Sequence, residues 1–499
     1  MFLNRMICKN LLQICPQTRR FYSFLTRDLY PEVKRGPYAV LASSHIQTFE
    51  NLLGKDRVIT DKDELIAYNK DWLNMVCGHS SVALKPKTTE EVSEIMKICY
   101  KEHLAVCPQG GNTGVVGGSV PVFDEVILSM SLMNKIHHID IDGGTVSCDA
   151  GCVLEQLDTK VAKEGLMMPL DLGAKGTCQI GGNIATCAGG LRLIRYGSLA
   201  ANLLGLEVVL ANGEVLSMMN QMKKDNTGYH LKNLFLGSEG TLGVVTKAVI
   251  QCATRPKSVT LAFLGLDNYE NVVKTFRSAK NHLSETLSSC EMMDAGSMES
   301  VMRLGLTCPI KQNRFYMIIE THGSNLNHDE EKMAAFITEA VDSKVVADGT
   351  FTSQPSSMLN LWQLRERIPE SVVRFGYMYT YDISLPLSHF YEVVHETRKR
   401  LSKHGFSNLP VFGCGHIGDG NLHILIEGPS YQDEVTNLLE PWLFEWTVKH
   451  GGSMSAEHGL GFKKRKYIGL GKSSSVVDIM LSLKKQFDPT GILNPYKVI

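Results

Sequence analysis

The chain has 499 residues, a length that exceeds one ordinary hydrophobic core and predicts two or three domains. Its 51 Lys and Arg residues nearly cancel its 52 Asp and Glu residues, so the composition excludes the strongly basic surface of a nucleic-acid-binding protein and an attraction to acidic membranes. No apolar run approaches the roughly 18 residues that a membrane-spanning helix needs. The 13 cysteines are scattered without a CxxC pair, which indicates reduced thiols and argues against a disulfide framework or a zinc–cysteine site.

The N-terminal segment is basic. Lys and Arg residues occupy positions 5, 9, 19, 20 and 27, and the first acidic residue is Asp28. This composition is typical of a mitochondrial transit peptide, and the arginine at position 20 predicts cleavage after Tyr22. We therefore expect residues 1–22 to direct the protein to the mitochondrial matrix. The alternative is a disordered basic tail.

Between about residues 56 and 255, short β-branched runs alternate with glycine-rich turns and helices. Residues 82–86, 126–128 and 206–210 are predicted strands. Residues 89–102 are a predicted helix with Thr89 as its N-cap, and residues 211–214 contain the Asn-Gly pair of a tight hairpin. We place a first domain at residues 45–255.

After residue 255, glycine thins out and strand–helix–strand units begin. Residues 259–264 and 315–320 are predicted strands and residues 269–283 a helix, which indicates an α+β domain with helices on one face of an antiparallel sheet. This second domain covers residues 256–455. The C-terminal segment, residues 456–499, turns helical and is expected to return to the first domain.

The strongest chemical signal is a set of glycine-rich loops. Residues 108–119 read PQGGNTGVVGGS; their glycines let the backbone approach a ligand, and successive N–H groups form a cradle for an anion such as a pyrophosphate. One such loop alone could equally be a turn without a ligand. Further loops at residues 169–176, 180–190 with 196–197, and 237–243 together predict a long, backbone-lined channel for a dinucleotide. The one GxGxxG match, residues 413–418, precedes a strand-like run rather than a helix, which disfavours a Rossmann site.

These loops and the closing residues 491–495, GILNP, resemble the FAD-binding domain of the vanillyl-alcohol-oxidase family. The resemblance implies an α+β protein with a two-part FAD-binding domain, an α+β substrate domain with an antiparallel sheet, and a helical C-terminal segment. No histidine lies between residues 108 and 119, so we expect FAD to be bound without a covalent link. By this resemblance, the cofactor-binding residues are Pro108, Gly110, Gly111, Asn112, Thr113, Gly114, Gly118, Ser119, Pro169, Asp171, Gly173, Gly176, Gly181, Gly182, Asn183, Thr186, Gly190, Tyr196, Gly197, Glu239, Gly240, Val245 and Asn494.

Two histidines and a glutamate form the second signal. His416 and His423 lie close together in the chain, and Glu457 follows further along. Two histidines and a carboxylate can hold Zn²⁺ or a similar ion and leave positions open for a substrate. From the spacing alone, Asp419 and His458 compete as ligands, and each histidine could be an ordinary buried residue.

This part of the chain resembles the metal-dependent D-2-hydroxy-acid dehydrogenase branch of the same family. The resemblance makes His416, His423 and Glu457 the ligands of a divalent metal, with Zn²⁺ expected. It makes Asn421 a substrate contact and His458 the catalytic base, in contact with the substrate hydroxyl. In such a site the metal lowers the pKa of the hydroxyl, the histidine takes the proton, and a hydride passes to the flavin. The resemblance also implies electron-transfer flavoprotein as the acceptor.

Two segments, residues 364–371 and 379–386, match the substrate domain of that branch. Arg365 stands where the branch has a carboxylate-binding arginine, whose planar fork suits a carboxylate; the alternative is a helix charge paired with a neighbouring acid. The branch also places a threonine and a lysine beside this carboxylate, where the chain has Pro369 and Thr380. We expect oxidation of D-2-hydroxyglutarate to 2-oxoglutarate, with D-lactate or another short D-2-hydroxy acid as the alternative.

Three other classes of protein compete with this interpretation. A related flavin oxidase would pass electrons to O₂, and the sequence does not decide oxygen access. A non-enzymatic flavoprotein or metal-binding module would leave His458, Asn421 and Arg365 without a shared purpose. A nicotinamide-linked dehydrogenase is disfavoured because a credible Rossmann fingerprint is missing. The sequence leaves the oligomeric state open, with a homodimer as one option.

Overall fold

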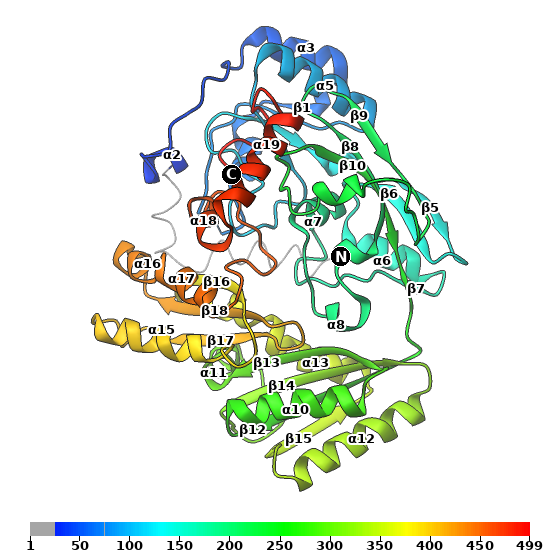
Figure 1. Ribbon diagram of the computed structural model, residues 1–499, viewed down its shortest axis with the longest axis vertical. Helices are drawn as coiled ribbons and strands as arrows, with labels where there is room; N and C mark the ends of the chain where they lie inside the picture. Colours follow the sequence, from blue (N-terminus) through cyan, green and yellow to red (C-terminus); the bar gives the residue numbers. More distant parts are fainter. Residues whose placement is uncertain (1–24, 74) are drawn as a thin grey trace. The chain divides into compact units, whose positions relative to one another are not determined.

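A computed structural model describes residues 25–73 and 75–499 of the chain, so the predicted transit segment lies outside the described residues. The described residues form two compact units (Figure 1). The first, here called the glycine-loop unit, comprises residues 25–189 together with Gly197–Arg255 and Glu457–Ile499. The second, the seven-stranded unit, comprises Gly190–Tyr196 and Pro256–Ala456.

The glycine-loop unit contains two main sheets. In the four-stranded sheet, β1 pairs antiparallel with β2, and β2, β4 and β3 run parallel. The five-stranded sheet has the order β5-β6-β10-β8-β9 and is antiparallel throughout. The strands are β1 Val58–Ile59, β2 Ala83–Leu84, β3 Val106–Gln109, β4 Val126–Ser129, β5 Ile136–Asp140, β6 Thr145–Asp149, β8 Leu203–Val209, β9 Val215–Met218 and β10 Val244–Gln251, with a separate pair, β7 Leu166–Met167 and β11 Ala253–Thr254.

Helices of this unit pack on a core that both sheets share, because Leu84 and Val106 of one sheet and Val208 and Ile250 of the other belong to the same buried apolar cluster. The helices are α2 Thr26–Leu29, α3 Ser43–Leu53, α4 Lys62–Asn69, α5 Thr89–Glu102, α6 Leu154–Ala162, α7 Ile180–Thr186, α9 Leu199–Asn202, α18 Ile468–Gly471 and α19 Ser474–Phe487.

The start of α5 corrects one expectation. The N-cap is Thr88, whose side chain accepts a hydrogen bond from the Glu91 backbone N–H, whereas Thr89 is the first helical residue and is buried. Two adjacent threonines are equivalent in sequence; the side chain of Thr89 is drawn inward because its hydroxyl bonds to buried Glu207 at 2.6 Å. The predicted hairpin after β8 is confirmed, since β8 and β9 pair antiparallel around Gly213, which has a φ of +83°.

The end of the chain is built into the glycine-loop unit. Leu493 forms a parallel bridge with Val106, and the Asn494 N–H donates to the Val106 carbonyl at 2.7 Å. The Asn494 side-chain amide then donates to the carbonyls of Gly118 and Glu239, at 2.9 and 2.7 Å. Asn494 therefore ties the first glycine loop to the last one.

The seven-stranded unit is built on one sheet with the order β15-β12-β14-β13-β17-β18-β16, in which every pair is antiparallel. Its predicted strands and helix are confirmed. The strands are β12 Ser258–Leu266, β13 Leu287–Asp294, β14 Phe315–Gly323, β15 Asp348–Thr352, β16 Tyr377–Ser384, β17 Val411–His416 and β18 Asn421–Gly428. The helices are α8 Leu193–Tyr196, α10 Tyr269–His282, α11 Ala295–Met302, α12 Leu326–Asp342, α13 Pro355–Glu366, α14 Ile368–Phe375, α15 Glu392–Lys403, α16 Asp433–Leu439 and α17 Trp442–Lys449.

The expectation that helices cover one face of this sheet is wrong. Tyr269 of α10 contacts Phe315 of β14, whereas Trp362 of α13 bonds to Glu320, five residues further along the same strand. Side chains five positions apart in a strand point to opposite faces, so α10 and α13 lie on different sides of the sheet. The second face carries buried charges, and the helix that covers it must supply their partners.

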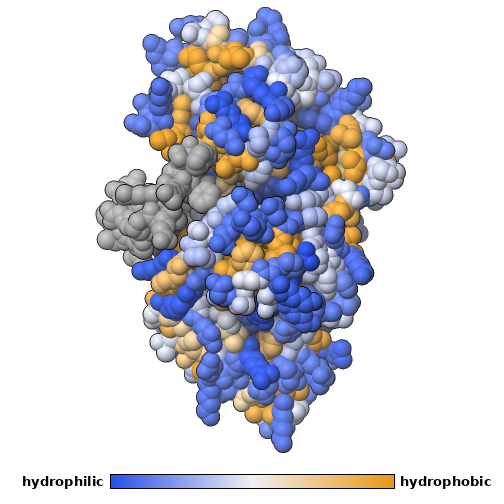
Figure 2. Space-filling model, turned by 90° about the vertical axis from the view of Figure 1, so that its left-hand side faces the viewer, coloured by the Kyte–Doolittle hydropathy of each residue, from blue (hydrophilic) through white to orange (hydrophobic). Residues whose placement is uncertain are grey.

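The surface of the protein is mixed in character. Figure 2 shows one face, where hydrophilic side chains dominate and apolar patches are scattered. Among residues 25–73 and 75–499, none of the helices combines the length and hydropathy that crossing a bilayer requires.

Candidate active site

A cavity in the glycine-loop unit is surrounded by the predicted loops and by Glu457 and His458. Three separate glycine-rich segments contribute to its lining. The predicted cofactor residues that line it are Pro108, Gly110, Gly111, Asn112, Thr113, Gly114, Gly118, Ser119, Gly173, Gly181, Gly182, Asn183, Thr186, Glu239, Gly240 and Val245.

The glycines of this cavity serve two different purposes. A Cβ added to Gly114, Gly173 or Gly182 would meet no described atom within 4 Å, so these residues leave open space where a ligand can reach the backbone. Gly111 differs, because its Cβ would lie 2.1 Å from the carbonyl oxygen of Thr177. Gly111 therefore allows two loops to pack together.

The cavity also contains buried acceptors that lack protein donors. Gln179 Oε1 and Asn183 Oδ1 are buried and have no hydrogen-bond partner among the described residues. Both residues line the cavity. A buried acceptor without a donor is costly, and the hydroxyl groups of a ribityl or ribose chain would satisfy it. The open glycine positions and these acceptors fit a dinucleotide.

Glu239 holds the segment that carries Glu457 and His458. Its carboxylate accepts hydrogen bonds from the backbone N–H groups of Leu460 and Gly461, at 2.7 and 2.8 Å. Burial raises the pKa of Glu239, although these bonds oppose the rise. The residue has a φ of +49°, a conformation that an L-residue adopts only where its surroundings require it.

In the seven-stranded unit, two imidazole rings converge. His416 ends β17 and His423 follows the tight turn into β18; their Nε2 atoms lie 3.5 Å apart, with the rings at 88° to each other. The opposite side of His416 is fixed, because its Nδ1 bonds to Glu291 Oε1 at 2.7 Å. His423 Nδ1 lies 3.8 Å from Asp382 Oδ1. Two converging Nε2 atoms, each with a carboxylate behind it, match the donor set of a metal-binding histidine pair.

Glu291 is bonded on both sides. Besides His416, it accepts a hydrogen bond from Arg365 Nε at 3.0 Å, and it is completely buried. Burial alone would raise the pKa of Glu291, but its interactions with His416 and Arg365 outweigh this effect and hold the pKa below its ordinary value of 4.5. The predicted substrate arginine is thus a buried side chain fixed by a carboxylate, not an exposed helix charge.

The other predicted substrate residues lie on the same face of the sheet. Asn421 is buried, and its side-chain amide donates to Asp382 Oδ1 and to the Ile383 carbonyl, at 2.8 and 3.1 Å. Thr380 is half-buried in β16, two residues before Asp382. Asp419, a competing ligand by spacing, accepts a hydrogen bond from the Asn421 backbone N–H and so shapes the turn.

Comparisons with known proteins identify the family of this chain. Residues 80–218 match a family model described as FAD binding domain, and residues 255–498 match FAD linked oxidases, C-terminal domain. A mitochondrial D-2-hydroxyglutarate dehydrogenase of Bos taurus is 50% identical over 95% of this chain and 87% of that protein. The D-2-hydroxyglutarate–pyruvate transhydrogenase of Saccharomyces cerevisiae is 43% identical over 95% of this chain and 98% of its own length.

This chain belongs to the D-2-hydroxyglutarate dehydrogenase family of FAD-linked oxidases. Alkyldihydroxyacetonephosphate synthase has a similar fold, with a TM-score of 0.71 at 19% identity over 93% of this chain and 86% of that one. The expected fold class and the FAD cofactor are therefore confirmed.

Several predicted cofactor residues are not among those that line this cavity. Gly190 and Tyr196 belong to the seven-stranded unit, where the Tyr196 hydroxyl bonds to His322 Nδ1 at 2.6 Å. Asp171 pairs with Lys175 at 3.0 Å. Within the described part of the chain, the cavity lining also omits Pro169, Gly176, Gly197 and Asn494.

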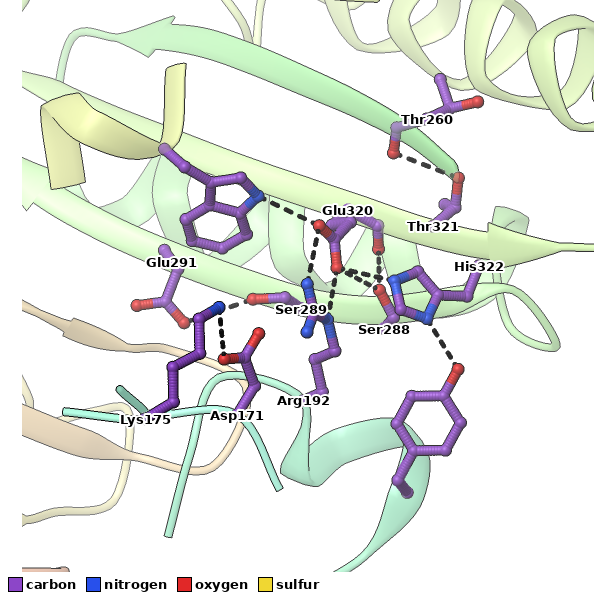
Figure 3. Close-up of polar contacts among 12 residues, drawn as sticks. Asp171, Lys175, Arg192, Thr260, Ser288, Ser289, Glu291, Glu320, Thr321 and His322 are labelled. Atoms are coloured by element: carbon purple, nitrogen blue, oxygen red, sulfur yellow. Dashed lines mark hydrogen bonds and ion pairs between the residues drawn. The ribbon is translucent and has the colours of Figure 1, made fainter. Parts of the chain in front are cut away.

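The segment Gly190–Tyr196 is retained by a buried cluster in the seven-stranded unit. Glu320 accepts hydrogen bonds from Arg192 Nε at 2.8 Å, Ser288 Oγ at 3.0 Å and Trp362 Nε1 at 3.0 Å, and it pairs with His322 Nε2 at 2.9 Å (Figure 3). Burial would raise the pKa of Glu320, but Arg192 and His322 hold it well below 4.5. Tyr196 follows Arg192 in this segment, which explains its position.

Glu291, Asp382 and Gln179 were missed by the sequence analysis. Each lies in a part of the site that forms through contacts distant in sequence; the Glu291–His416 bond spans 125 residues. A weak signal existed for Glu291, because it is the one charged residue within the run LSSCEMM, residues 287–293. A charge inside a buried strand needs a partner, but the sequence does not name that partner.

Proposed function

We propose that this protein oxidises D-2-hydroxyglutarate to 2-oxoglutarate, with FAD bound non-covalently and with a divalent metal held by His416, His423 and Glu457. The convergence of the two histidine Nε2 atoms at 3.5 Å carries this proposal. Glu457 follows Ala456, whose backbone N–H donates to Asp382 Oδ2 at 3.1 Å. The proposed ligand set therefore combines two imidazoles and one carboxylate, which suits Zn²⁺.

In the proposed reaction, the bound cofactor, the bound metal and the side chains of the protein have separate roles. Bound FAD supplies the acceptor for the hydride, and a bound divalent metal supplies polarisation of the substrate hydroxyl. His458 lines the cavity and accepts the hydroxyl proton as general base. Arg365 binds the substrate carboxylate, and Asn421 fixes the hydroxy-acid end through its side-chain oxygen.

A shorter D-2-hydroxy acid such as D-lactate is the second candidate substrate, and the surroundings of Thr380 favour it. Thr380 pairs across the sheet with Leu425, which pairs in turn with Phe412. Both neighbours are apolar and buried. A second carboxylate placed there would be a buried charge that needs a partner, and neither Thr380 nor Pro369 supplies a cation.

The electrons leave the flavin for electron-transfer flavoprotein in the mitochondrial matrix under this proposal. The mitochondrial names of relatives and the basic residues before Asp28 support the compartment. Pyruvate is the competing acceptor, since one relative is named as a transhydrogenase that uses it. Molecular oxygen would instead give peroxide during turnover.

An absorption experiment tests the proposal. Purified protein should show flavin bands that bleach under anaerobic conditions on addition of D-2-hydroxyglutarate and, more slowly, of D-lactate. Acid precipitation should release all of the yellow colour if the link is non-covalent. Flavin that no D-2-hydroxy acid reduces would overturn the proposed reaction, and colour retained in the pellet would overturn the non-covalent link.

A further inference from the structure

We infer that Glu291 is a positioning residue that orients the metal-binding histidine pair and the substrate arginine together. This inference rests on the proposed metal site and on Arg365 as the carboxylate-binding residue. Glu291 lies at the centre of β13, directly opposite His416 of β17, and α13 brings Arg365 to it from above the sheet. One side chain thus contacts residues of two other elements.

The two bonds use different oxygens of the carboxylate. Oε1 receives the Nδ1 proton of His416 at 2.7 Å, and Oε2 receives the Nε proton of Arg365 at 3.0 Å. With the proton held on Nδ1, the neutral His416 ring presents its Nε2 lone pair toward His423 Nε2. The same carboxylate fixes the plane of the guanidinium through Nε. A rotation of Glu291 would therefore misalign both groups.

A glutamine cannot replace this arrangement. Its single carbonyl oxygen can accept one of the two hydrogen bonds, and its NH₂ group would face a second donor. The affinity for a metal typically falls tenfold to a hundredfold when the group behind a histidine ligand is changed. Glu291→Gln should therefore weaken metal binding although Glu291 is not a ligand.

Glu320 provides a matched control on the same face of the sheet. It is a buried glutamate paired with an arginine, as Glu291 is, and it lies in the adjacent strand β14. Its partners are Arg192, Trp362, Ser288 and His322, none of which is a proposed metal ligand. Glu320→Gln therefore removes a similar buried charge without altering the histidine pair.

The experiment measures Zn²⁺ binding to the purified flavoprotein by competition with a chromophoric chelator, alongside KM, kcat and flavin content. Glu291→Gln should lower Zn²⁺ affinity by about ten- to a hundredfold and raise KM, while flavin content stays at the wild-type level. Glu320→Gln should leave Zn²⁺ affinity within about twofold of wild type. If Glu291→Gln does not fold, Glu291→Asp keeps the charge, shortens the side chain and should lower Zn²⁺ affinity to a smaller extent.

The inference is overturned if the folded Glu291 variants bind Zn²⁺ as tightly as wild type, or if Glu320→Gln weakens binding equally. His423→Ala separates this failure from failure of the proposed site. Loss of Zn²⁺ in His423→Ala with unchanged binding in Glu291→Gln rejects the positioning role alone. Unchanged Zn²⁺ binding in His423→Ala rejects the metal site itself.

Discussion

Glu291 and Glu320 in the seven-stranded unit are paired with arginine side chains, whereas Glu239 and Glu125 in the glycine-loop unit accept hydrogen bonds from backbone N–H groups. All four are buried. The pKa values of Glu291 and Glu320 are lowered, and burial raises those of Glu239 and Glu125. The first two glutamates are therefore compensated by side-chain charges and the last two by backbone N–H groups, and the two kinds should respond differently to the same perturbation.

Removing the metal should have the largest effect, because turnover should be lost while flavin binding is retained. A chelator should lower kcat on the order of a thousandfold, because a metal contributes several kcal/mol of stabilisation to the developing charge. The flavin should stay bound, since Glu457 is the only proposed metal ligand among the residues that line the glycine-loop cavity. Turnover is measured before and after adding back Zn²⁺. Activity that survives complete metal removal would contradict the prediction.

Thr380→Lys should have the next largest effect. A lysine would supply the cation that a second substrate carboxylate needs, and a charged hydrogen bond is worth about 1.5–3 kcal/mol. KM for D-2-hydroxyglutarate should fall roughly ten- to a hundredfold, with KM for D-lactate nearly constant. Thr352→Lys, a threonine on strand β15 at the other end of the sheet order, serves as the control. Equal effects on both substrates would place the distal carboxylate elsewhere.

Glycine substitutions should distinguish the glycines that face open space in the cavity from those that allow two loops to pack together. Gly182→Ala adds a methyl to open space in the cavity, so FAD affinity should fall about tenfold or more, as expected for overpacking of 1–3 kcal/mol, while the melting temperature of the apoprotein is retained. Gly111→Ala meets the Thr177 carbonyl instead, and should lower the melting temperature as well. Flavin titration and thermal melts of the apoproteins measure both. If both variants change FAD affinity and melting temperature equally, the two glycines do not have different roles.

The smallest expected effect is a difference in how the stability contributions of Glu320 and Glu239 depend on pH. A carboxylate whose folded pKa is lowered contributes stability above its unfolded pKa of 4.5 and loses it as pH falls below that value. The destabilisation caused by Glu320→Gln should therefore shrink as pH falls below about 4.5. Glu239 has a raised folded pKa, so its contribution is present below 4.5 and lost as pH rises through the folded pKa.

Glu239→Gln should accordingly become less destabilising, relative to wild type, as pH rises. Melting temperatures measured from about pH 4 to pH 8 should differ by a few degrees across the range. Parallel pH profiles for the two variants would show that the paired and backbone-bonded carboxylates do not titrate differently.

Local sequence was sufficient for the parts of the site that form locally. The glycine loops were located because glycine alone permits the required backbone approach. His416 and His423 were singled out by their short spacing, and the structure joins their strands by one tight turn. The resemblance to the oxidase family then supplied the cofactor. Neither inference depended on contacts between distant segments.

The remaining features depend on tertiary contacts that sequence patterns do not encode. Glu291 meets His416 only through strand register, and Arg365 was placed by resemblance without its carboxylate partner. Tyr196 was assigned to the cofactor by resemblance, and the sequence did not show that the Arg192–Glu320 pair holds its segment in the seven-stranded unit. The choice between Thr88 and Thr89 as N-cap likewise depended on Glu207, more than one hundred residues away.

The segment Gly190–Tyr196 also determines how this protein can be divided. A gene fragment for residues 256–456 would encode all seven strands of the sheet but omit Arg192. Glu320 would then lose its cation, and breaking a buried pair in this way typically costs about 3–5 kcal/mol. The seven-stranded unit is thus discontinuous in its own gene, and a fragment designed to fold alone would need the seven residues grafted back or Glu320 replaced by an uncharged side chain.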